Sequence, residues 1–451
     1  MIPLLLIVFL SQQPIHAQSL DHGHGNARPG QRVATVRPDG NLQTALDHGG
    51  RVALTPGAVY SGTFVVRKSG TSLDCLGASI VGPRTGPAIH VAPGTNDWAI
   101  VNCIASTAND QRVIQIGNND AAQTALDKVP RRGIITGLRI PTCRCKKGIE
   151  VNGAEVEIRG SDIADVYDPG GRDSQAVAIL NTPGPVLVDG NELSSGSEPI
   201  MIGGDTMKIP GTVPSDITIS NNHIYRPEAW RGDGVNRAVK NLLELKTGVR
   251  VKVLNNRFEG NWRAAQPGYA IVVTPRSGGD IHDVLFDGNT LDRTAAGFNI
   301  MGADSATITP SPVSGVVIRN MKATLRKSTY GGNGAFIQLT TEVQDVATEN
   351  VAVDTDGAAI VLGDFGARMM PDGSVVKTGK LGSFSMTNSL CRVGKYSFFF
   401  RAANASKWPA VLNALSVSRN TFADADPALV KGFPDNTYVD DATFETAFAA
   451  R

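Results

Sequence analysis

The amino-acid sequence predicts an all-β solenoid, and three observations lead to that fold class. Short alternating strands recur about every 30 residues, and most of them end in asparagine. A second family of apolar strands lies between them, from residue 175 to residue 401, and no helix-length apolar period separates the two families. Parallel strands without crossover helices do not form a doubly wound sheet, but their coils can stack about 4.8 Å apart.

The asparagines mark the repeat. They are Asn191, Asn222, Asn256, Asn289, Asn320, Asn350, Asn388 and Asn420. Neighbouring members are 30 to 38 residues apart, which leaves room for at least two strands and a turn in each repeat. We expect the first four to stack in one column. The segments 98–105 and 132–140 have the pattern of earlier, less regular coils.

The chain divides into four segments. We predict a signal peptide over residues 1–17, a flexible segment over 18–38, the solenoid of about ten coils over 39–423, and a C-terminal cap over 424–451. The apolar run 2–10 is too short to span a bilayer and suits a signal peptide, although a truncated or mis-started chain is the alternative. The stretch "GNLQTALDHGG" (40–50) predicts a short helix that caps the first coil. Because the predicted signal peptide would direct export, we expect the mature protein to be secreted or periplasmic.

Composition narrows the partners. The 451 residues are 41% hydrophobic and 19% charged, which fits a folded chain. The formal net charge of +1 gives no reason to expect nucleic acid or a membrane surface as partner. No other segment is long and apolar enough for membrane insertion. We expect a monomer.

These repeats resemble the right-handed parallel β-helix of the pectin-lyase-like superfamily, over roughly residues 52–423. Stacked asparagines at turns are a known feature of that fold. The resemblance implies a site on one outer sheet, walled by loops. Motifs of its polygalacturonases are not in place, because "GHG" (23–25) precedes the solenoid and the only "DD" is Asp440-Asp441. No pectate-lyase strand motif is evident either, so the subfamily stays unassigned.

The stretch "VKNLLELK" (239–246) predicts a half-buried strand, with Val239, Leu243 and Leu245 on one side and Lys240, Leu242, Glu244 and Lys246 on the other. Met201 and Val272 should flank Glu244 in adjacent coils, and Arg276 should approach Lys246. The cations would then surround one carboxylate. Lyases that resemble this fold use Lys or Arg as the base at C5 of a uronic acid, so the resemblance implies Lys246 as base, helped by Glu244, Arg276 and Lys240. The alternative is a solvated Glu244–Lys246 ion pair.

Aromatic and cationic residues gather in an insertion from about 205 to 240 and in the segment 255–268. Sugars bind through aromatic stacking and planar polar groups. The candidate substrate-binding residues are His223, Tyr225, Arg226, Trp230, Trp262, Arg263 and Gln266. The alternative is that Trp230 and Trp262 only pack loops onto the solenoid.

Acidic residues provide further candidates. Asp173, Glu198 and Asp205 could hold Ca²⁺ if turns bring them together. A glycoside hydrolase would use two of Asp173, Glu198, Asp205, Glu228 and Glu244 as acid and base. Three functions therefore remain open: a lyase acting on an acidic polysaccharide, which leads; a glycoside hydrolase; and a non-catalytic glycan-binding or adhesive solenoid.

Cysteines give one pairing to test. Cys75 and Cys103 fall at equivalent places in consecutive coils, within disulfide range, with two free thiols as the alternative. Cys143 and Cys145 flank one residue, a strained spacing for a direct disulfide, and they lack two further ligands for zinc.

Overall fold

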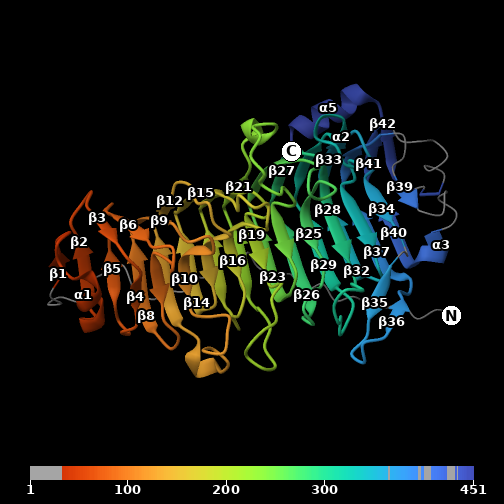
Figure 1. Cartoon of the computed structure of the whole chain (residues 1–451). Helices are drawn as coiled ribbons and strands as arrows, with labels where there is room; N and C mark the ends of the chain where they lie inside the picture. Colours follow the sequence, from red (N-terminus) through yellow and green to blue (C-terminus); the bar gives the residue numbers. More distant parts are fainter. Residues whose placement is uncertain (1–32, 364–365, 395–397, 401–407, 424–431, 434) are drawn as a thin grey trace.

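The computed structural model describes residues 33–363, 366–394, 398–400, 408–423, 432–433 and 435–451. The strands stack in three long parallel sheets, so each coil contributes three strands rather than the two families visible in the sequence (Figure 1). Sheet C has twelve strands, which gives twelve complete coils where about ten were expected. The predicted signal peptide lies outside the described residues.

Sheet A contains β1 (Val33–Val36), β2 (Arg51–Leu54), β5 (Ser72–Asp74), β8 (Asn96–Val101), β11 (Arg131–Thr136), β14 (Ala154–Arg159), β17 (Val186–Asp189), β20 (Ile217–Ser220), β23 (Gly248–Leu254), β26 (Ile281–Asp287), β29 (Ser314–Arg319), β32 (Gln344–Glu349), β37 (Leu381–Thr387) and β40 (Leu412–Ser418).

Sheet B contains β3 (Val59–Ser61), β6 (Ser79–Gly82), β9 (Ile104–Thr107), β12 (Arg139–Ile140), β15 (Asp162–Val166), β18 (Glu192–Ser195), β21 (His223–Tyr225), β24 (Arg257–Asn261), β27 (Thr290–Thr294), β30 (Lys322–Leu325), β33 (Ala352–Thr355), β38 (Leu390–Arg392), β41 (Thr421–Ala423) and β42 (Thr437–Val439).

Sheet C contains β4 (Phe64–Val66), β7 (Ile89–Val91), β10 (Arg112–Ile116), β13 (Lys147–Val151), β16 (Gln175–Ile179), β19 (Ile200–Ile202), β22 (Leu243–Leu245), β25 (Tyr269–Val273), β28 (Ala296–Met301), β31 (Ile337–Thr340), β34 (Ile360–Leu362) and β39 (Phe398–Phe400). A separate antiparallel hairpin pairs β35 (Ala367–Met369) with β36 (Val375–Lys377).

The helices are short and lie outside the coils. They are α1 (Leu42–His48), η1 (Leu126–Lys128), η2 (Glu228–Trp230), α2 (Lys327–Tyr330), α3 (Trp408–Val411) and α5 (Asp441–Ala449). The capping helix is confirmed, because α1 begins after Asn41, whose side chain accepts from Thr44 N, and buries Leu42 and Leu46. At the other end β42 extends sheet B, and Phe444 of α5 is buried against β38 and β41. Part of the segment expected to be flexible, residues 33–36, instead forms the strand β1, which pairs with β2.

The asparagine column is confirmed for its four central members. Asn191 Nδ2 donates to Asn222 Oδ1, Asn222 Nδ2 to Asn256 Oδ1, and Asn256 Nδ2 to Asn289 Oδ1, at 2.9 to 3.0 Å. Each of these amides also donates to a backbone carbonyl of a preceding coil, for example Asn222 to Val188 O. The ladder therefore satisfies buried polar groups at the turns between sheets A and B in these four coils.

Three later asparagines do not belong to this column. Asn320, Asn350 and Asn388 lie one residue earlier, with φ between 51° and 54°. That left-handed position is occupied by Gly190 and Gly288 in ladder coils, and it favours glycine or asparagine because other side chains are strained there. The same residue type thus serves two purposes, which the spacing alone cannot separate.

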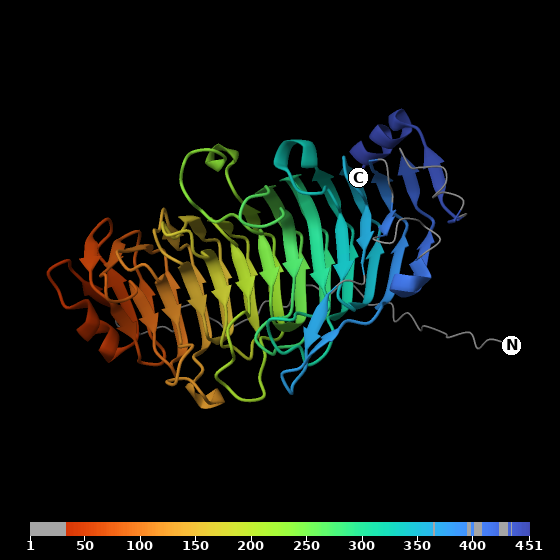
Figure 2. The ribbon, with the colours of Figure 1, turned by 45° about the vertical axis from the view of Figure 1, so that its right-hand side comes forward.

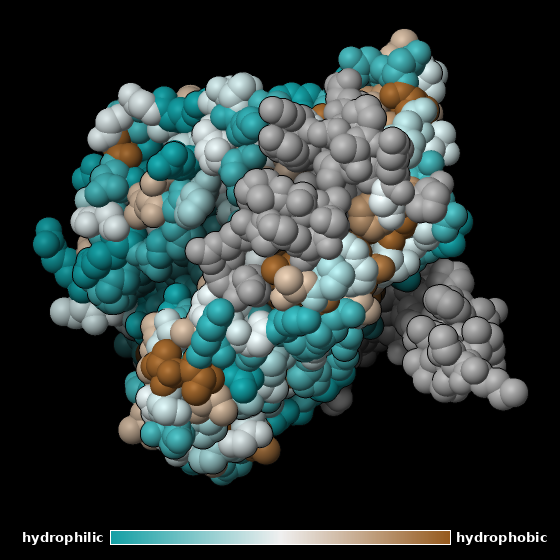
Figure 3. Space-filling view, turned by 90° about the vertical axis from the view of Figure 1, so that its right-hand side faces the viewer, coloured by the Kyte–Doolittle hydropathy of each residue, from teal (hydrophilic) through white to brown (hydrophobic). Residues whose placement is uncertain are grey.

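Apolar side chains from all three sheets fill the interior of the solenoid in one continuous core. Phe298 lies edge to face against Phe286 of the same coil and Phe336 of the next, with centroids 5.1 and 5.7 Å apart. The C-terminal end of the molecule is mostly hydrophilic where the described residues show, with small apolar patches (Figure 3).

The expected disulfide between Cys75 and Cys103 is present. The expectation for Cys143 and Cys145 was wrong, since these two residues are also bonded. They lie in the irregular segment between β12 and β13, where the backbone holds their Cα atoms 5.2 Å apart, within disulfide range.

Candidate active site

The outer face of sheet C carries a continuous row of side chains, one from each of the ten successive strands from β7 to β34. In register order the row is His90, Gln115, Glu150, Ala178, Met201, Glu244, Val272, Asn299, Gln338 and Val361. Met201 and Val272 therefore flank Glu244 as predicted. The connections from sheet B to sheet C and from sheet C to sheet A are the long ones, and they border this face on its two edges (Figures 1 and 2).

The stretch 239–246 forms a shorter strand than its alternation predicted. Only Leu243–Leu245 pair with neighbouring strands. Leu242 belongs to the core instead of the outer face, and Val239 packs into an outer cluster under the loops. Lys240 lies before the strand, and its side chain contacts Asp173 and Glu198, which belong to earlier coils.

Lys240 joins two carboxyl groups at the centre of the face. Its Nζ lies 2.5 Å from Asp173 Oδ1 and 3.5 Å from Glu198 Oε1. The two oxygens can therefore be no more than about 6 Å apart, a separation at which paired carboxyl groups can work as acid and base. The side chain of Asp173 is 44% exposed, whereas Glu198 is fully buried.

The pKa of Glu198 lies well above the usual value of a glutamate. Burial, and then the charges of Glu244 and Asp173, raise its pKa to about 8, against the opposing effects of Lys246 and Lys240. Gln175 Nε2 donates to its Oε2 at 2.8 Å, while Oε1 makes no hydrogen bond. At neutral pH this residue is a carboxylic acid with a proton to give.

Lys246 and Glu244 form the ion pair that was the alternative interpretation. Lys246 Nζ lies 3.3 Å from Glu244 Oε2 and 3.5 Å from the sulfur of Met201. The contact between Lys246 Nζ and Glu244 Oε2 is an ion pair but not a hydrogen bond. The buried Glu244 Oε2 can therefore still accept one. Arg276 donates its backbone N–H to Lys246 O at 2.8 Å, but its guanidinium pairs with Asp304 in the next coil, also at 2.8 Å.

The expected excess of positive charge around one carboxylate is therefore not found. Every cation named at the centre has its own acidic partner: Lys240 has Asp173 and Glu198, Lys246 has Glu244, and Arg276 has Asp304. Burial lowers the pKa of Lys240, but Glu198 and then Asp173 raise it more, so the net shift is upward and its ammonium stays charged.

Further polar groups lie along the same face on both sides of this centre. On the N-terminal side, Arg112 and Lys147 both lie 3.2 Å from Glu150 Oε2. Gln115 Nε2 and His90 Nε2 both contact Asn118 Oδ1, at 3.1 and 3.0 Å. These cations, like those at the centre, already have a carboxylate partner.

On the C-terminal side the polar groups are uncharged. Gln338 Nε2 donates to Asn299 Oδ1 at 2.9 Å, and Tyr269 Oη donates to Gln338 Oε1 at 2.9 Å. Asn333 Nδ2 in turn donates to Tyr269 Oη at 2.6 Å. Amides and hydroxyls of this kind suit sugar hydroxyl groups, which both donate and accept.

The two predicted tryptophans lie in one cluster. Trp230 belongs to the loop between β21 and β22 and Trp262 to the loop between β24 and β25, both of which connect sheet B to sheet C (Figure 2 shows the loops). Trp262 is buried against Val239 and Tyr330, and Trp230 packs against this group. Arg231 lies over the Trp262 and Tyr330 rings, at 6.0 and 4.8 Å. This packing agrees with the alternative interpretation, in which the tryptophans fix loops to the solenoid. Arg263 and Gln266 belong to the second of these loops, and Arg263 N donates to Tyr330 O.

His223, Tyr225 and Arg226 are not part of the face. His223 and Tyr225 lie on β21 in sheet B, where His223 contacts Glu192 at 2.7 Å and Glu259 at 2.8 Å. Burial raises the pKa of Glu259, but the hydrogen bond from His223 and the nearby arginines lower it below its usual value overall. Arg226 is 1% exposed, so it cannot meet a substrate. The insertion expected over 205–240 is in fact two loops, separated by β20 and β21, on opposite edges of sheet C.

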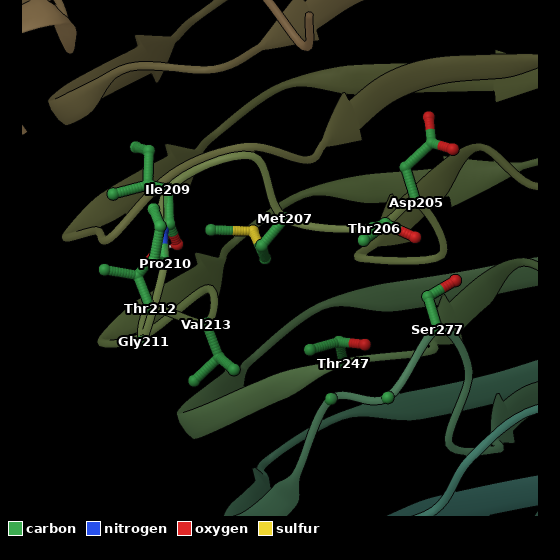
Figure 4. A pocket seen from close by; sticks show the side chains of 12 residues that line it. Asp205, Thr206, Met207, Ile209, Pro210, Gly211, Thr212, Val213, Thr247 and Ser277 are labelled. Atoms are coloured by element: carbon green, nitrogen blue, oxygen red, sulfur yellow. Dashed lines mark hydrogen bonds between the residues drawn. The ribbon is translucent and has the colours of Figure 1, made fainter. Parts of the chain in front are cut away.

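The three candidate metal ligands are not assembled. Lys240 supplies the positive charge between Asp173 and Glu198, and Asp205 accepts from Asn119 Nδ2 at 2.9 Å. Within the described residues, no group of three His, Cys, Asp or Glu side chains could hold a metal ion. Asp205 lies instead at the edge of a cavity of about 190 Å³, lined mainly by Thr206, Met207, Thr212, Val213, Thr247 and Ser277 (Figure 4).

Sequence reasoning missed Gln115, Glu150, Asn299 and Gln338. Asn299 and Gln338 lie in the second strand family at the position equivalent to Glu244, so aligning those strands on their apolar residues would have found them. Gln115 and Glu150 hold the same position in strands that precede the family recognised in the sequence. The link between Asp173 and Lys240 had no such signal, because it depends on the conformation of two loops.

Comparison with known proteins agrees with this architecture. The chain belongs to the family described as the right handed beta helix region, whose model matches residues 87–350. No helix in the described part of the chain is long and apolar enough to cross a membrane. A comparison with curated proteins finds no significant match.

Solved structures similar to this one share the fold at low sequence identity. The catalytic domain of a GH87 alpha-1,3-glucanase in complex with tetrasaccharides is 13% identical, over 88% of this chain and 70% of that chain, with a TM-score of 0.56. The catalytic unit of a thermostable GH87 alpha-1,3-glucanase from Streptomyces thermodiastaticus is 13% identical, over 91% and 71%, with a TM-score of 0.52.

Proposed function

We propose that the protein is a carbohydrate-active enzyme that hydrolyses glycosidic bonds in a glycan chain bound along the outer face of sheet C. The observation that carries this proposal is the geometry at its centre: Glu198, a buried carboxyl group with a raised pKa, lies within about 6 Å of the exposed carboxyl group of Asp173. Two carboxyl groups in different protonation states are what general acid–base hydrolysis of a glycoside requires.

In this mechanism Glu198 gives its proton to the glycosidic oxygen as the bond to the anomeric carbon breaks. Asp173 either takes a proton from the attacking water or attacks the anomeric carbon itself. Because the Lys240 ammonium lies 3.5 Å from Glu198 Oε1 and Glu198 has no exposed surface, substrate reaches this oxygen only when Lys240 moves aside.

The charge balance favours a neutral glycan over an acidic one. At the centre of the face a uronate carboxylate would need a free cation, but Lys240, Lys246 and Arg276 are each paired with a carboxylate. Arg112 and Lys147, which share Glu150, lie on the N-terminal side of this centre. The C-terminal half of the row offers amides and a phenol. The alpha-1,3-glucanase domains that share this fold act on a neutral glucan, which supports the class of substrate without identifying it.

The test compares wild type with Glu198→Gln on a panel of neutral and uronate-containing polysaccharides, scored by new reducing ends. We expect wild-type activity on a neutral polysaccharide and a loss of about 10² to 10⁴ in Glu198→Gln, the range for a general acid. The exposed variant Glu349→Gln is the control. An inert wild type on the whole panel would favour a non-catalytic glycan-binding solenoid.

A polysaccharide lyase is the second candidate. It is favoured by the place of Lys246, whose side chain is 15% exposed on the outer face, one coil from the 40% exposed Arg276. In β-elimination Lys246 would remove the proton at C5 of a uronate, and Arg276 would leave Asp304 to neutralise the substrate carboxylate. That function requires both Lys246 and Arg276 to leave their carboxylate partners, whereas hydrolysis requires only Lys240 to move.

Secretion, a monomeric state and Ca²⁺ dependence stay proposals. The Cys75–Cys103 disulfide supports an oxidising compartment. N-terminal sequencing of the exported protein should find cleavage after Ala17. Sedimentation should give one chain of 47.5 kDa less the signal peptide. Activity that vanishes with a chelator and returns with Ca²⁺ would show a metal requirement.

A further inference from the structure

Arg226 is the largest charged side chain in the interior, and it follows directly after β21. Its guanidinium donates to five uncharged acceptors. Nε donates to the carbonyls of Ser195 at 3.0 Å and Gly196 at 2.9 Å, and Nη1 to Asn261 Oδ1 at 2.6 Å. Nη2 donates to the carbonyls of Ser197 and Asn241.

These acceptors belong to the segments that carry the proposed active site. Ser195, Gly196 and Ser197 directly precede Glu198 in the chain. Asn241 follows Lys240, and the backbone N–H groups of both residues donate to Ser197 O. One guanidinium therefore ties the backbone before Glu198 to the backbone after Lys240.

Among the residues that the structure describes, no carboxylate is in direct contact with the guanidinium of Arg226. Its acceptors are carbonyl and amide oxygens. Burial lowers the pKa of Arg226 to about 9, and the charge of Glu198 acts in the opposite direction. The other charged groups around Glu198 are Asp173, Glu244, Lys240 and Lys246, all of which lie on or beside sheet C.

Resting on the hydrolytic function proposed above, we propose that Arg226 is a positioning residue that holds Glu198 and Lys240 in register and places a buried positive charge near the Glu198 carboxyl group. Its fork of five donors matches carbonyls from three segments, which a lysine ammonium with three donors cannot do. Loss of the charge should make Glu198 hold its proton more tightly, because a cation stabilises the carboxylate.

The experiment follows Glu198 without substrate. Protein labelled with ¹³C at glutamate carboxyl carbons is titrated by NMR as wild type, Glu198→Gln, Arg226→Gln and Arg226→Lys. We expect one resonance that titrates near pH 8 in wild type and is missing from Glu198→Gln. In Arg226→Gln it should titrate at least about one pH unit higher, and in Arg226→Lys within about half a unit of wild type. The surface variant Arg250→Gln should change nothing.

Kinetics supply the second measurement. Arg226→Lys should lower kcat by at least about tenfold with KM nearly unchanged, because the charge remains while the geometry is lost. A folded Arg226→Gln protein in which Glu198 titrates as in wild type would overturn the proposal. So would failure of both Arg226 variants to fold, which would give Arg226 a purely structural role. An inert wild type refutes hydrolysis instead, and leaves the titration result intact.

Discussion

The ammonium of Lys240 lies 2.5 Å from Asp173 Oδ1, although the two residues are two coils apart. The coil between them carries Glu198, 3.5 Å from the same nitrogen. This contact turns three residues that are remote in sequence into one group with two carboxyl functions and one cation. Because Lys240 is already paired, it is not free to bind the carboxylate of a uronate substrate.

Asp173→Asn should remove most of the activity and leave the fold intact. The variant loses the ionised partner of Glu198, so we expect a fall of about 10² to 10⁴ in kcat. The side chain is 44% exposed and its ion pair is partly solvated, so the free energy of unfolding should change by no more than about 1 kcal/mol. Asp216→Asn, at a solvent-exposed pair with Arg250, is the matched control. A fully active Asp173→Asn enzyme would assign the base elsewhere.

Glu198 should make stability depend on pH. Burial, with the charges of Glu244 and Asp173, raises its pKa from 4.5 to about 8 in the folded protein. The folded state then keeps a proton that the unfolded state releases, so this contribution is complete below about pH 4.5 and is lost as the pH rises through about 8.

Urea unfolding at several pH values between these limits measures the effect. Wild type should become less stable toward the alkaline end, and Glu198→Gln should lose that part of the decline. The exposed Glu349→Gln should follow wild type. Parallel wild-type and Glu198→Gln curves would show that Glu198 is ionised in the folded protein.

Lys246→Ala separates the two candidate reactions. If the enzyme is a hydrolase, Lys246 only partners Glu244, and activity should stay within about tenfold of wild type. If it is a lyase with Lys246 as base, turnover should fall by about 10² to 10⁴. Thermal melting of the variant, measured in parallel, shows whether any loss comes from unfolding.

Asn222→Ala should destabilise the solenoid. The asparagine amide bonds Asn256 Oδ1 and Val188 O, and its carbonyl oxygen accepts from Asn191. Truncation leaves buried groups unpaired, at a cost of about 1–3 kcal/mol. Asn221→Gly is the neighbouring control: φ is 56° there and the side chain is exposed, so glycine fits and the change should be smaller. Equal effects in the two variants would contradict the ladder.

The fold could be predicted because the same short pattern of alternating strand and asparagine recurs along the sequence about every 30 residues. The asparagine column and the apolar strands depend on local periodicity, and both were confirmed. The third strand of each coil escaped notice because strands such as Glu192–Ser195 are short and partly polar. Asn320 was counted in the repeat with the column asparagines, although it lies at the left-handed turn position, which also favours asparagine.

The site could be predicted only in part. The outward position of Glu244 and its neighbours Met201 and Val272 followed from strand alternation. The acidic partners of the lysines and arginines could not be predicted in this way, because ion pairs such as Arg276–Asp304 depend on loops between coils. Arg226 was expected at the surface, but it is buried and donates to backbone carbonyls in the segment before Glu198. The pattern of side chains in a sequence does not show where backbone carbonyls point, so this contact could not be predicted.

The mass of the products tests the central claim most directly. Wild-type protein is incubated in H₂¹⁸O with the polysaccharide that it cleaves best, and the oligosaccharides are measured by mass spectrometry. Hydrolysis adds one water across each broken bond, so every new pair of ends gains one ¹⁸O atom, and Glu198→Gln should abolish these products. Products lighter by one water, with an unsaturated non-reducing end and no ¹⁸O, would show β-elimination and contradict the account.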